Sequence, residues 1–287
     1  MPGLNGHQSP AAETLGGSAG SVARRFVDVH CHVLPGVDDG PTDMAASMEM
    51  CRALVNDGIS TVIATPHQLG RYEGANSPAQ VRAAVAELMV EIEKLGLPLT
   101  VLPGADVRVH ERLVDMIEQD RVTTIADKGK HILLELPHET LIDLTFLNRA
   151  LMNRGIQGIM THPERHHALR RKPELLARWI ADGMLVQITA GSLIGLFGPN
   201  SQNNAWDLID AGMVHIVATD AHDHEQRPPV FTEAFEVLEE DIGRAMAEQI
   251  CLVNPLMVLE GEHIPTGRMQ RNAATGQVGG FQSRRME

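Results

Sequence analysis

The sequence predicts an α/β fold made of repeated strand and helix units, and two observations support this prediction. Short apolar runs alternate with amphipathic stretches along the chain, a pattern typical of a mostly parallel sheet covered by helices. Each apolar run also becomes polar at its end. Seven such units over roughly 240 residues match the size of a (β/α) barrel, with an open doubly wound sheet as the alternative.

The predicted strands are the seven segments with an apolar start and a polar end. In chain order they are RRFVDVHCHV (24–33), STVIATPH (60–67), LTVLPGADV (99–107), HILLELP (131–137), IQGIMTHP (156–163), MLVQITAG (184–191) and VHIVATDAH (214–222). Their spacing leaves room for a helix between most neighbouring strands.

The predicted helices are recognised by apolar residues that recur every three or four positions. One stripe contains Val81, Val85, Leu88, Met89, Ile92 and Leu95; a second contains Phe235, Leu238, Ile242, Met246 and Ile250; a third contains Met44, Met48, Cys51 and Val55. We therefore expect Cys51 and its neighbouring methionines to pack in the core.

These units predict one domain, residues 26–263, between two flexible tails. Residues 1–25 and 264–287 are rich in small and polar residues and show no apolar periodicity. No apolar run reaches the length of a membrane span, and the first 25 residues contain no secretory signal. We expect a cytoplasmic protein.

The composition argues against several functional classes. The formal net charge is −13, which argues against a nucleic-acid partner, because binding to a phosphate backbone requires clusters of Lys and Arg. The three cysteines, at unrelated spacings, indicate neither a disulfide framework nor a thiolate zinc site. The chain has an unusual number of histidines, fourteen, and the question is whether they are scattered along it or gathered at the ends of the predicted strands.

The first strand segment places two histidines together. In DVHCHVLPGVDDG (28–40), Asp28, His30 and His32 share one face of the strand because side chains alternate with a period of two. An HxH pair at a strand end can present two imidazole nitrogens to one metal ion. Alone this signal is weak, because paired histidines are also common on exposed strands.

The same placement recurs at the ends of other strand segments, and this strengthens the prediction of a metal site. His67 could instead cap a turn, and Glu135 could be a buried structural carboxylate. Burial of so many ionisable groups together would be unfavourable without metals. The donor types favour a multinuclear cluster of Mn²⁺, Fe²⁺ or Zn²⁺. The candidate groups are His30, His32, Asp39, His67, Asp106, Glu135, His162, Asp220 and His222.

In this order, the motifs DVHCHVLPGVDDGP, ATPH, GAD, LLELP, THPERH, QITAGSLIGLFG and ATDAHDHEQRPP resemble the PHP (polymerase and histidinol phosphatase) superfamily. Within it, LPGVDDGP, THPER and RPP are most similar to the bacterial protein-tyrosine phosphatases of capsule and exopolysaccharide synthesis, the CpsB/YwqE type. The resemblance covers residues 26–262.

The resemblance implies a distorted (β/α)7 TIM-like barrel of the PHP type that holds three divalent metal ions, with Mn²⁺ expected and iron or zinc as alternatives. It implies the nine groups above as metal ligands, and Arg165 and Arg227 as catalytic residues that bind phosphate. One position departs from the family: Asp106 stands where the family normally has a bridging glutamate, which is one methylene longer.

The implied activity is hydrolysis of phosphotyrosine by attack of a metal-bound hydroxide, with a role in capsule or exopolysaccharide synthesis. The implied partner is a phosphotyrosine protein, the tyrosine-rich tail of a polysaccharide-export tyrosine kinase. Three alternatives stay open: a small-molecule phosphomonoesterase of the histidinol-phosphatase kind, a nuclease and a non-catalytic metal-binding module.

A cysteine phosphatase is disfavoured by the sequence itself. Such an enzyme needs a cysteine with an arginine six positions later, and none of the three cysteines has one. Cys31 alternates away from His30 and His32, so we assign it to packing. In the loop after His67, Arg71 and Tyr72 could contact a peptide, although the sequence favours an ordinary solvated loop.

Overall fold

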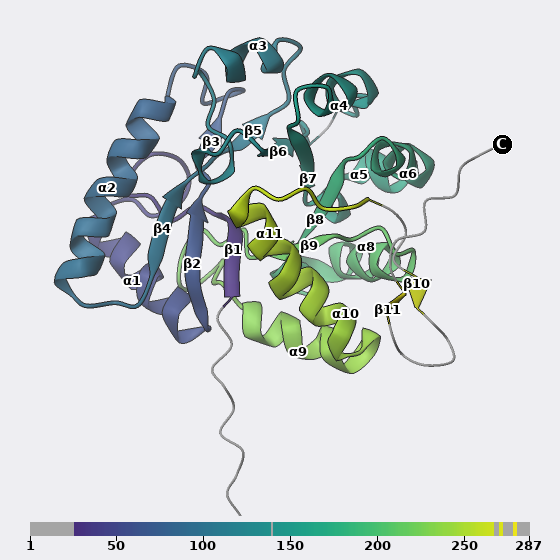
Figure 1. Ribbon diagram of the computed structural model, residues 1–287. Helices are drawn as coiled ribbons and strands as arrows, with labels where there is room; N and C mark the ends of the chain where they lie inside the picture. Colours follow the sequence, from purple (N-terminus) through teal and green to yellow (C-terminus); the bar gives the residue numbers. More distant parts are fainter. Residues whose placement is uncertain (1–25, 139, 267–269, 272–277, 280–287) are drawn as a thin grey trace, which may run out of the picture.

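Two parallel sheets form the centre of the computed structural model, which describes residues 26–138, 140–266, 270–271 and 278–279 (Figure 1). One sheet has the order β1-β2-β4 and the other the order β3-β5-β6-β7-β8-β9, with parallel pairing throughout. The strands are β1 (Phe26–Cys31), β2 (Ile59–Ala64), β3 (His67–Gln68), β4 (Thr100–Pro103), β5 (Asp106–Arg108), β6 (His131–Glu135), β7 (Gln157–Thr161), β8 (Leu185–Thr189) and β9 (Ile216–Ala218). The predicted α/β fold with a parallel arrangement is confirmed.

Two of the predicted strands are each divided into two short ones. STVIATPH becomes β2 and β3, separated by Thr65 and Pro66, and LTVLPGADV becomes β4 and β5, separated by Gly104 and Ala105. Proline cannot donate to a strand ladder. Gly104 is required by close packing, since a Cβ there would lie 2.5 Å from Cγ2 of Ile63. These two breaks explain why the pairing forms two sheets.

Helices surround the strands on the outside, and α11 lies in front of them in Figure 1. The helix α2 begins with a capping box formed by Ser77 and Gln80. The helices are α1 (Met44–Asn56), α2 (Pro78–Lys94), α3 (Leu113–Glu118), α4 (Thr145–Met152), α5 (His167–Arg170), α6 (Pro173–Ala181), α7 (Ala190–Leu193), α8 (Gly198–Asp210), α9 (Phe231–Ile242), α10 (Arg244–Glu248) and α11 (Asn254–Glu260), with short η1 (Ile125–Asp127), η2 (Pro163–Arg165) and η3 (Gln249–Val253).

Apolar side chains form two clusters, one between the strands and the helices and one among the strands. The outer cluster contains the predicted stripe of α2 except for Leu95, which is exposed, and Met89, which is partly buried. Cys51 and Met48 are buried in it, as predicted. The strand residues of the inner cluster are Val27, Val29, Ile63, Leu133, Ile159, Leu185, Ile216 and Ala218.

The chain after α11 packs against the start of β7. Ile264 is fully buried, and both its backbone groups bond to the side chain of Gln157, at 3.1 Å (N to Oε1) and 2.8 Å (O to Nε2). Ile264 is the first residue of the predicted C-terminal tail. The tail also contains the two-residue pair β10 (Gln270–Arg271) and β11 (Val278–Gly279), whereas 267–269, 272–277 and 280–287, like the predicted tail 1–25, lie outside the described residues.

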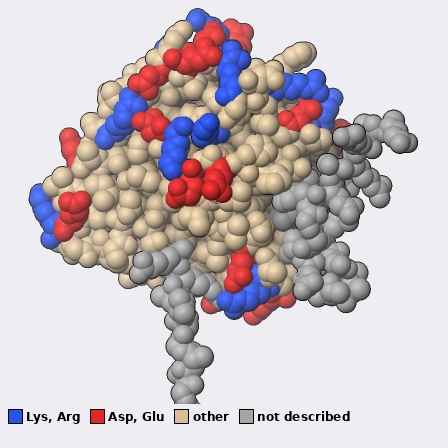
Figure 2. All heavy atoms as spheres, in the orientation of Figure 1, with Lys and Arg blue, Asp and Glu red and all other residues tan. Residues whose placement is uncertain are grey.

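Charges on the face shown in Figure 2 are mixed: basic side chains lie next to acidic ones and leave wide uncharged areas between them. Lys128 forms an ion pair with Glu260 of α11 at 3.6 Å. Within the described part of the chain, no helix has both the length and the apolar character needed to cross a membrane.

Candidate metal centre

The nine candidate ligands meet at the carboxyl ends of the strands. His30 is the last residue but one of β1, His32 lies just beyond it, and Glu135 ends β6. His67 and Asp106 begin the short strands β3 and β5, which follow closely on the carboxyl ends of β2 and β4. The others follow strand ends or lie in the loop before α1: His162, Asp220, His222 and Asp39. Because carboxyl ends of parallel strands gather at one edge, side chains separated by up to 190 positions, such as His30 and Asp220, become neighbours.

These side chains form four overlapping groups in which the ligand atoms lie within 4.8 Å of one another. Several groups share a residue, as expected for ions bound side by side. His67 Nδ1, for example, lies 3.4 Å from Asp106 Oδ2 and 3.5 Å from Glu135 Oε2. The groups are His32, Asp39, His67 and His222; His30, His32 and Asp220; His30, Asp106 and His162; and His67, Asp106 and Glu135.

Unpaired buried atoms show that the cluster fits metal ions. Both carboxylate oxygens of Asp106 are buried without a hydrogen-bond donor, and Nδ1 of His67 also has no hydrogen-bond partner. Buried polar atoms are normally paired, because an unpaired one costs free energy. A cation between them would satisfy these atoms, and Asp106 belongs to two of the four groups.

Neighbouring charges shift the acidities within the cluster. Burial and, to a smaller extent, the nearby Asp106 together raise the pKa of Glu135 to about 7. Burial alone would raise the pKa of Asp106, but His30 and His67 hold it below its usual range. The two carboxyl groups therefore titrate apart, as expected for like charges that share a site.

The backbone at two candidate ligands adopts an uncommon conformation. His162 has φ of 34° and Asp220 has φ of 49°, both in the left-handed region that non-glycine residues rarely occupy. Such conformations persist where the surrounding structure enforces them and are concentrated at functional sites. Each turns the chain sharply at a strand end, where both side chains enter the cluster.

Three residues that orient the candidate ligands were missed by the sequence analysis. Asp38 accepts from His32 Nδ1 at 2.6 Å and from the His67 backbone N–H at 3.0 Å, and Gln187 Oε1 lies 2.9 Å from His30 Nδ1. Arg108 pairs with Glu135 at 3.0 Å. The signals available were the double aspartate of VDDG and a glutamine inside an apolar strand.

Asp28, which shares the strand face of the two histidines, is fully buried and serves a different purpose. Its oxygens accept from the backbone N–H of Thr219, at 3.0 Å, and from the Thr219 hydroxyl. Burial raises the pKa of Asp28 to about 7. Asp28 thereby ties β1 to the turn that carries Asp220.

The two predicted phosphate-binding arginines lie side by side at Asp220. Arg165, in η2, and Arg227, in the loop after His222, both donate to Asp220 Oδ2, the latter at 2.9 Å. The Nε–H groups of both arginines are buried and have no acceptor. Two cationic groups that each keep a donor without an acceptor can bind an anion beside the cluster.

A cavity of about 180 Å³ opens directly onto the cluster. Tyr72 stands at its rim with its ring stacked on that of His67, 5.5 Å between centroids and 15° between planes. Arg71 donates to both Tyr72 Oη and Asp39 Oδ2 at 2.7 Å. The lining residues are Asp39, His67, Leu69, Arg71, Tyr72, Arg108, Glu135 and His138.

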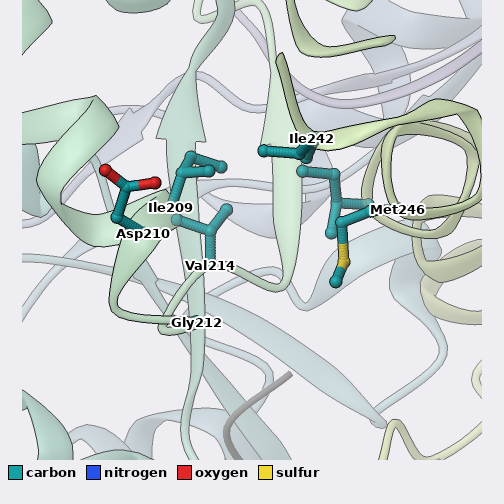
Figure 3. Close-up of a pocket in the computed structure, with 7 residues that line it drawn as sticks. Ile209, Asp210, Gly212, Val214, Ile242 and Met246 are labelled. Atoms are coloured by element: carbon teal, nitrogen blue, oxygen red, sulfur yellow. The ribbon is translucent and has the colours of Figure 1, made fainter. Parts of the chain in front are cut away.

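A second pocket lies away from the candidate ligands (Figure 3). Ile209 and Val214 line it from the end of α8 and the segment before β9, and Ile242 and Met246 from α9 and α10. Its other side chains are apolar except for Asp210, and it contains none of the nine groups. The chemistry is therefore assigned to the cavity at the cluster.

The three cysteines, Cys31, Cys51 and Cys251, are buried and free. Burial raises the pKa of Cys51 to about 12 and that of Cys31 above its usual value. A thiol nucleophile needs a lowered pKa and access to substrate. The geometry supports their assignment to packing.

Fold and site define a class: an α/β protein with parallel sheets and a cluster of histidines and carboxylates at the carboxyl ends of the strands. A family profile described as "Capsular polysaccharide synthesis, CpsB/CapC" matches residues 26–260, and the chain belongs to this family.

Named relatives agree with this assignment. The tyrosine-protein phosphatase YwqE of Bacillus subtilis is 38% identical over 222 residues, which are 76% of this chain and 85% of YwqE. The putative tyrosine-protein phosphatase CapC of Staphylococcus aureus is 32% identical over 212 residues, 73% of this chain and 82% of CapC. A crystal structure from work on YwqE and on CpsB of Streptococcus pneumoniae, described as metal-dependent tyrosine phosphatases, superposes with a TM-score of 0.80 and 34% identity, covering 86% of this chain and all of that one.

Proposed function

We propose that the protein is a metal-dependent protein-tyrosine phosphatase that hydrolyses phosphotyrosine in protein substrates. The observation that carries this proposal is the cluster of nine donors with two arginines beside it, in a chain whose relatives are named tyrosine-protein phosphatases. The nine donors are proposed as the metal ligands, and Arg165 and Arg227 as the residues that bind the phosphate.

The donor set suits several divalent ions. Imidazole and carboxylate donors without thiolate fit Mn²⁺, with iron or zinc as alternatives, and the four overlapping groups offer room for three ions. Divalent ions in this position would lower the pKa of a water molecule to about 7 and make it a nucleophile at neutral pH. The shorter Asp106 carboxylate contributes to two groups, which supports a bridging role.

Residues of the chain position the phosphate and the leaving group. The guanidinium groups of Arg165 and Arg227 match two phosphate oxygens and stabilise negative charge as it develops. Phenolate has a pKa of about 10, so an aryl ester needs less protonation on leaving than an alkyl ester does. The cavity bounded by Tyr72, Arg108 and His138 is where the tyrosine side chain would enter.

We also infer that the two sheets form the wall of a distorted seven-unit barrel. A parallel bridge joins Cys31 of β1 to Ala221 after β9, and His32 N–H donates to Ala221 O at 2.9 Å. The inner apolar cluster draws residues from strands of both sheets, as the interior of a barrel does. Only two residues separate β2 from β3 and β4 from β5.

The biological setting proposed is cytoplasmic regulation of capsule or exopolysaccharide synthesis. The family description supports the link to capsular polysaccharide. The proposed partner is the phosphorylated, tyrosine-rich tail of a polysaccharide-export tyrosine kinase. The acidic net charge of the chain and the mixed charges of the face in Figure 2 support a protein partner over a nucleic acid.

The test is phosphate release from a phosphotyrosine peptide by purified protein, before and after chelation and after Mn²⁺ is restored, with metal content measured on the same samples. We expect activity to disappear with the metals and to return with Mn²⁺. Faster release from histidinol phosphate than from the peptide would instead support a small-molecule phosphatase, and bound metal without any hydrolysis would overturn the proposal.

A further inference from the structure

The two arginines at Asp220 come from separate segments, and a further contact is needed to fix the orientation of their guanidinium groups. Arg165 ends η2, whereas Arg227 lies 62 positions later in a loop that follows β9. Arginine side chains are long and lose conformational entropy when they are held in one geometry. Asp220 fixes one nitrogen of each guanidinium group, which leaves the plane of the group free to turn.

Phe197 supplies a surface on which both guanidinium groups rest. The Cζ atom of Arg165 lies 4.7 Å from the centre of the Phe197 ring, and that of Arg227 lies 5.7 Å from the same ring. Both distances are within the range of cation–π attraction, which is stronger where the cation is removed from water. Arg165 is such a case, since its side chain is only 17% exposed.

The Phe197 ring is itself fixed in place by close packing against α7. A Cβ at Gly191 would lie 3.0 Å from Cε2 of Phe197 and 3.0 Å from Cδ2 of Leu196, so a larger residue at 191 would displace the ring. The turn between α7 and α8, which contains Phe197, is held to α8 by two hydrogen bonds. Gln202 and Trp206 of α8 both donate to the Leu193 carbonyl, at 3.0 and 3.3 Å.

One nitrogen of each guanidinium group has no hydrogen-bond acceptor, which indicates that Arg165 and Arg227 together bind an anion. Nε of Arg165 and Nε of Arg227 are both buried without an acceptor, although each guanidinium is already bonded to Asp220 and packed against Phe197. An anion with several acceptor oxygens, such as a phosphate group, would satisfy both.

We propose that Phe197 is a positioning residue: its ring holds the guanidinium groups of Arg165 and Arg227 in the orientation that binds a phosphate group. The proposal rests on the proposed phosphatase function and adds a residue outside the ligand and arginine set. Phe197 acts through the arginines and has no contact with substrate in this assignment.

The test compares Phe197→Leu, which keeps an apolar side chain without the ring face, with Phe197→Tyr, which keeps that face. We would measure the dissociation constant of inorganic phosphate for the metal-loaded protein, KM and kcat for para-nitrophenyl phosphate, and metal content. Phe197→Leu should weaken phosphate binding on the order of tenfold. The KM should rise by a similar factor with metal content unchanged, and Phe197→Tyr should restore both constants.

The matched control is Leu196→Ala, a change in the same turn at a side chain that also packs on Gly191 and is 43% exposed. It should leave both constants near those of the unchanged protein. If Phe197→Leu does not fold, Phe197→Met serves as the second apolar variant. A further check is the double variant of Phe197→Leu with Arg227→Ala, in which the two losses should be less than additive.

Several outcomes would overturn the proposal. Unchanged phosphate binding in Phe197→Leu would do so, and a higher KM with unchanged phosphate binding would mean that the ring contacts the aryl group of the substrate instead. Absence of phosphate binding by the unchanged protein would also do so. Phosphate binding without hydrolysis of phosphotyrosine would contradict the proposed function alone, because the variants could still be compared by phosphate binding.

Discussion

The adjacent residues Asp38 and Asp39 have different positions relative to the cluster. Asp39 belongs to a candidate ligand group, whereas Asp38 bonds to His32 Nδ1 and so leaves Nε2 of that ring facing the cluster. His32 lowers the pKa of Asp38 to about 2, although burial opposes this shift. A charged carboxylate behind a metal-binding imidazole fixes the ring and makes it a stronger ligand.

We therefore predict that Asp38→Asn weakens metal binding on the order of tenfold, since the amide can still accept a hydrogen bond but carries no charge. The measurement is a titration of metal-free protein with Mn²⁺ against a competing chelator. Asp43→Asn is the control, because Asp43 caps α1 and asparagine can cap a helix equally well. Equal Mn²⁺ affinity in Asp38→Asn and the unchanged protein would refute the assigned role.

A second prediction at this scale separates metal binding from phosphate binding. Arg227→Ala should leave metal content unchanged and lower kcat/KM for an aryl phosphate about a hundredfold, as loss of one donor to a developing charge does elsewhere. Arg170→Ala, at an exposed position, is the control. Loss of metal in Arg227→Ala would show that the arginine supports Asp220 and has no separate task.

At the scale of elements, one side chain connects the start of β7 to the segment after α11. Gln157 Nε2 donates to the carbonyls of Gly183 and Ile264, at 3.0 and 2.8 Å, and its Oε1 accepts from Ile264 N–H. All of these groups are buried. The glutamine side chain thus provides Ile264 with the two backbone hydrogen bonds that a neighbouring strand would otherwise provide.

Gln157→Ala should lower the free energy of unfolding by about 2–4 kcal/mol, because three buried backbone groups would lose their partner. Activity should persist under conditions in which the variant is folded, because residue 157 lies at the end of β7 opposite the candidate ligands. Denaturant titration, with exposed Gln119→Ala as the control, measures the effect. A loss no larger than that of the control would mean that water replaces the glutamine.

The elements themselves could be predicted from the sequence to a large extent, because burial imposes periodicity. All nine candidate ligands lie in the four groups, and this follows from one rule about the ends of parallel strands. The break at Gly104 could not be placed, since it depends on packing against Ile63, whereas Pro66 is a strand breaker that the sequence displays. Phe197 contacts Arg165 and Arg227 from other segments, and local pattern carries no signal for such contacts. Gln187 is different, because a glutamine inside an apolar strand is visible in the sequence.

At the scale of the whole molecule, two buried histidines link stability to pH. His131 begins β6 and His215 precedes β9, both at the ends of the strands opposite the candidate ligands. Burial lowers the pKa of each to about 4. Since this is below the value of about 6.5 in an unfolded chain, protons bind preferentially to the unfolded state as the pH falls below 6.5.

The resulting prediction is that metal-free protein loses stability between pH 6.5 and 4, with each histidine costing about 2 kcal/mol by pH 5. His131→Gln should reduce the difference in unfolding free energy between pH 7 and pH 5, measured by denaturant titration. The exposed His167→Gln is the control. An unchanged pH dependence in His131→Gln would show that His131 is protonated in the folded state.

The bond between Asp28 and Thr219 joins positions 191 residues apart and brings the first and last parts of the cluster together. A chain still emerging from the ribosome holds His30 and His32 long before Asp220 and His222 exist, so it has only fragments of the centre. Contacts of such long range form late, because closing a large loop costs entropy first. Tight uptake of the metal ions would accordingly mark the end of folding, and an incomplete chain could neither hold them firmly nor release phosphate prematurely.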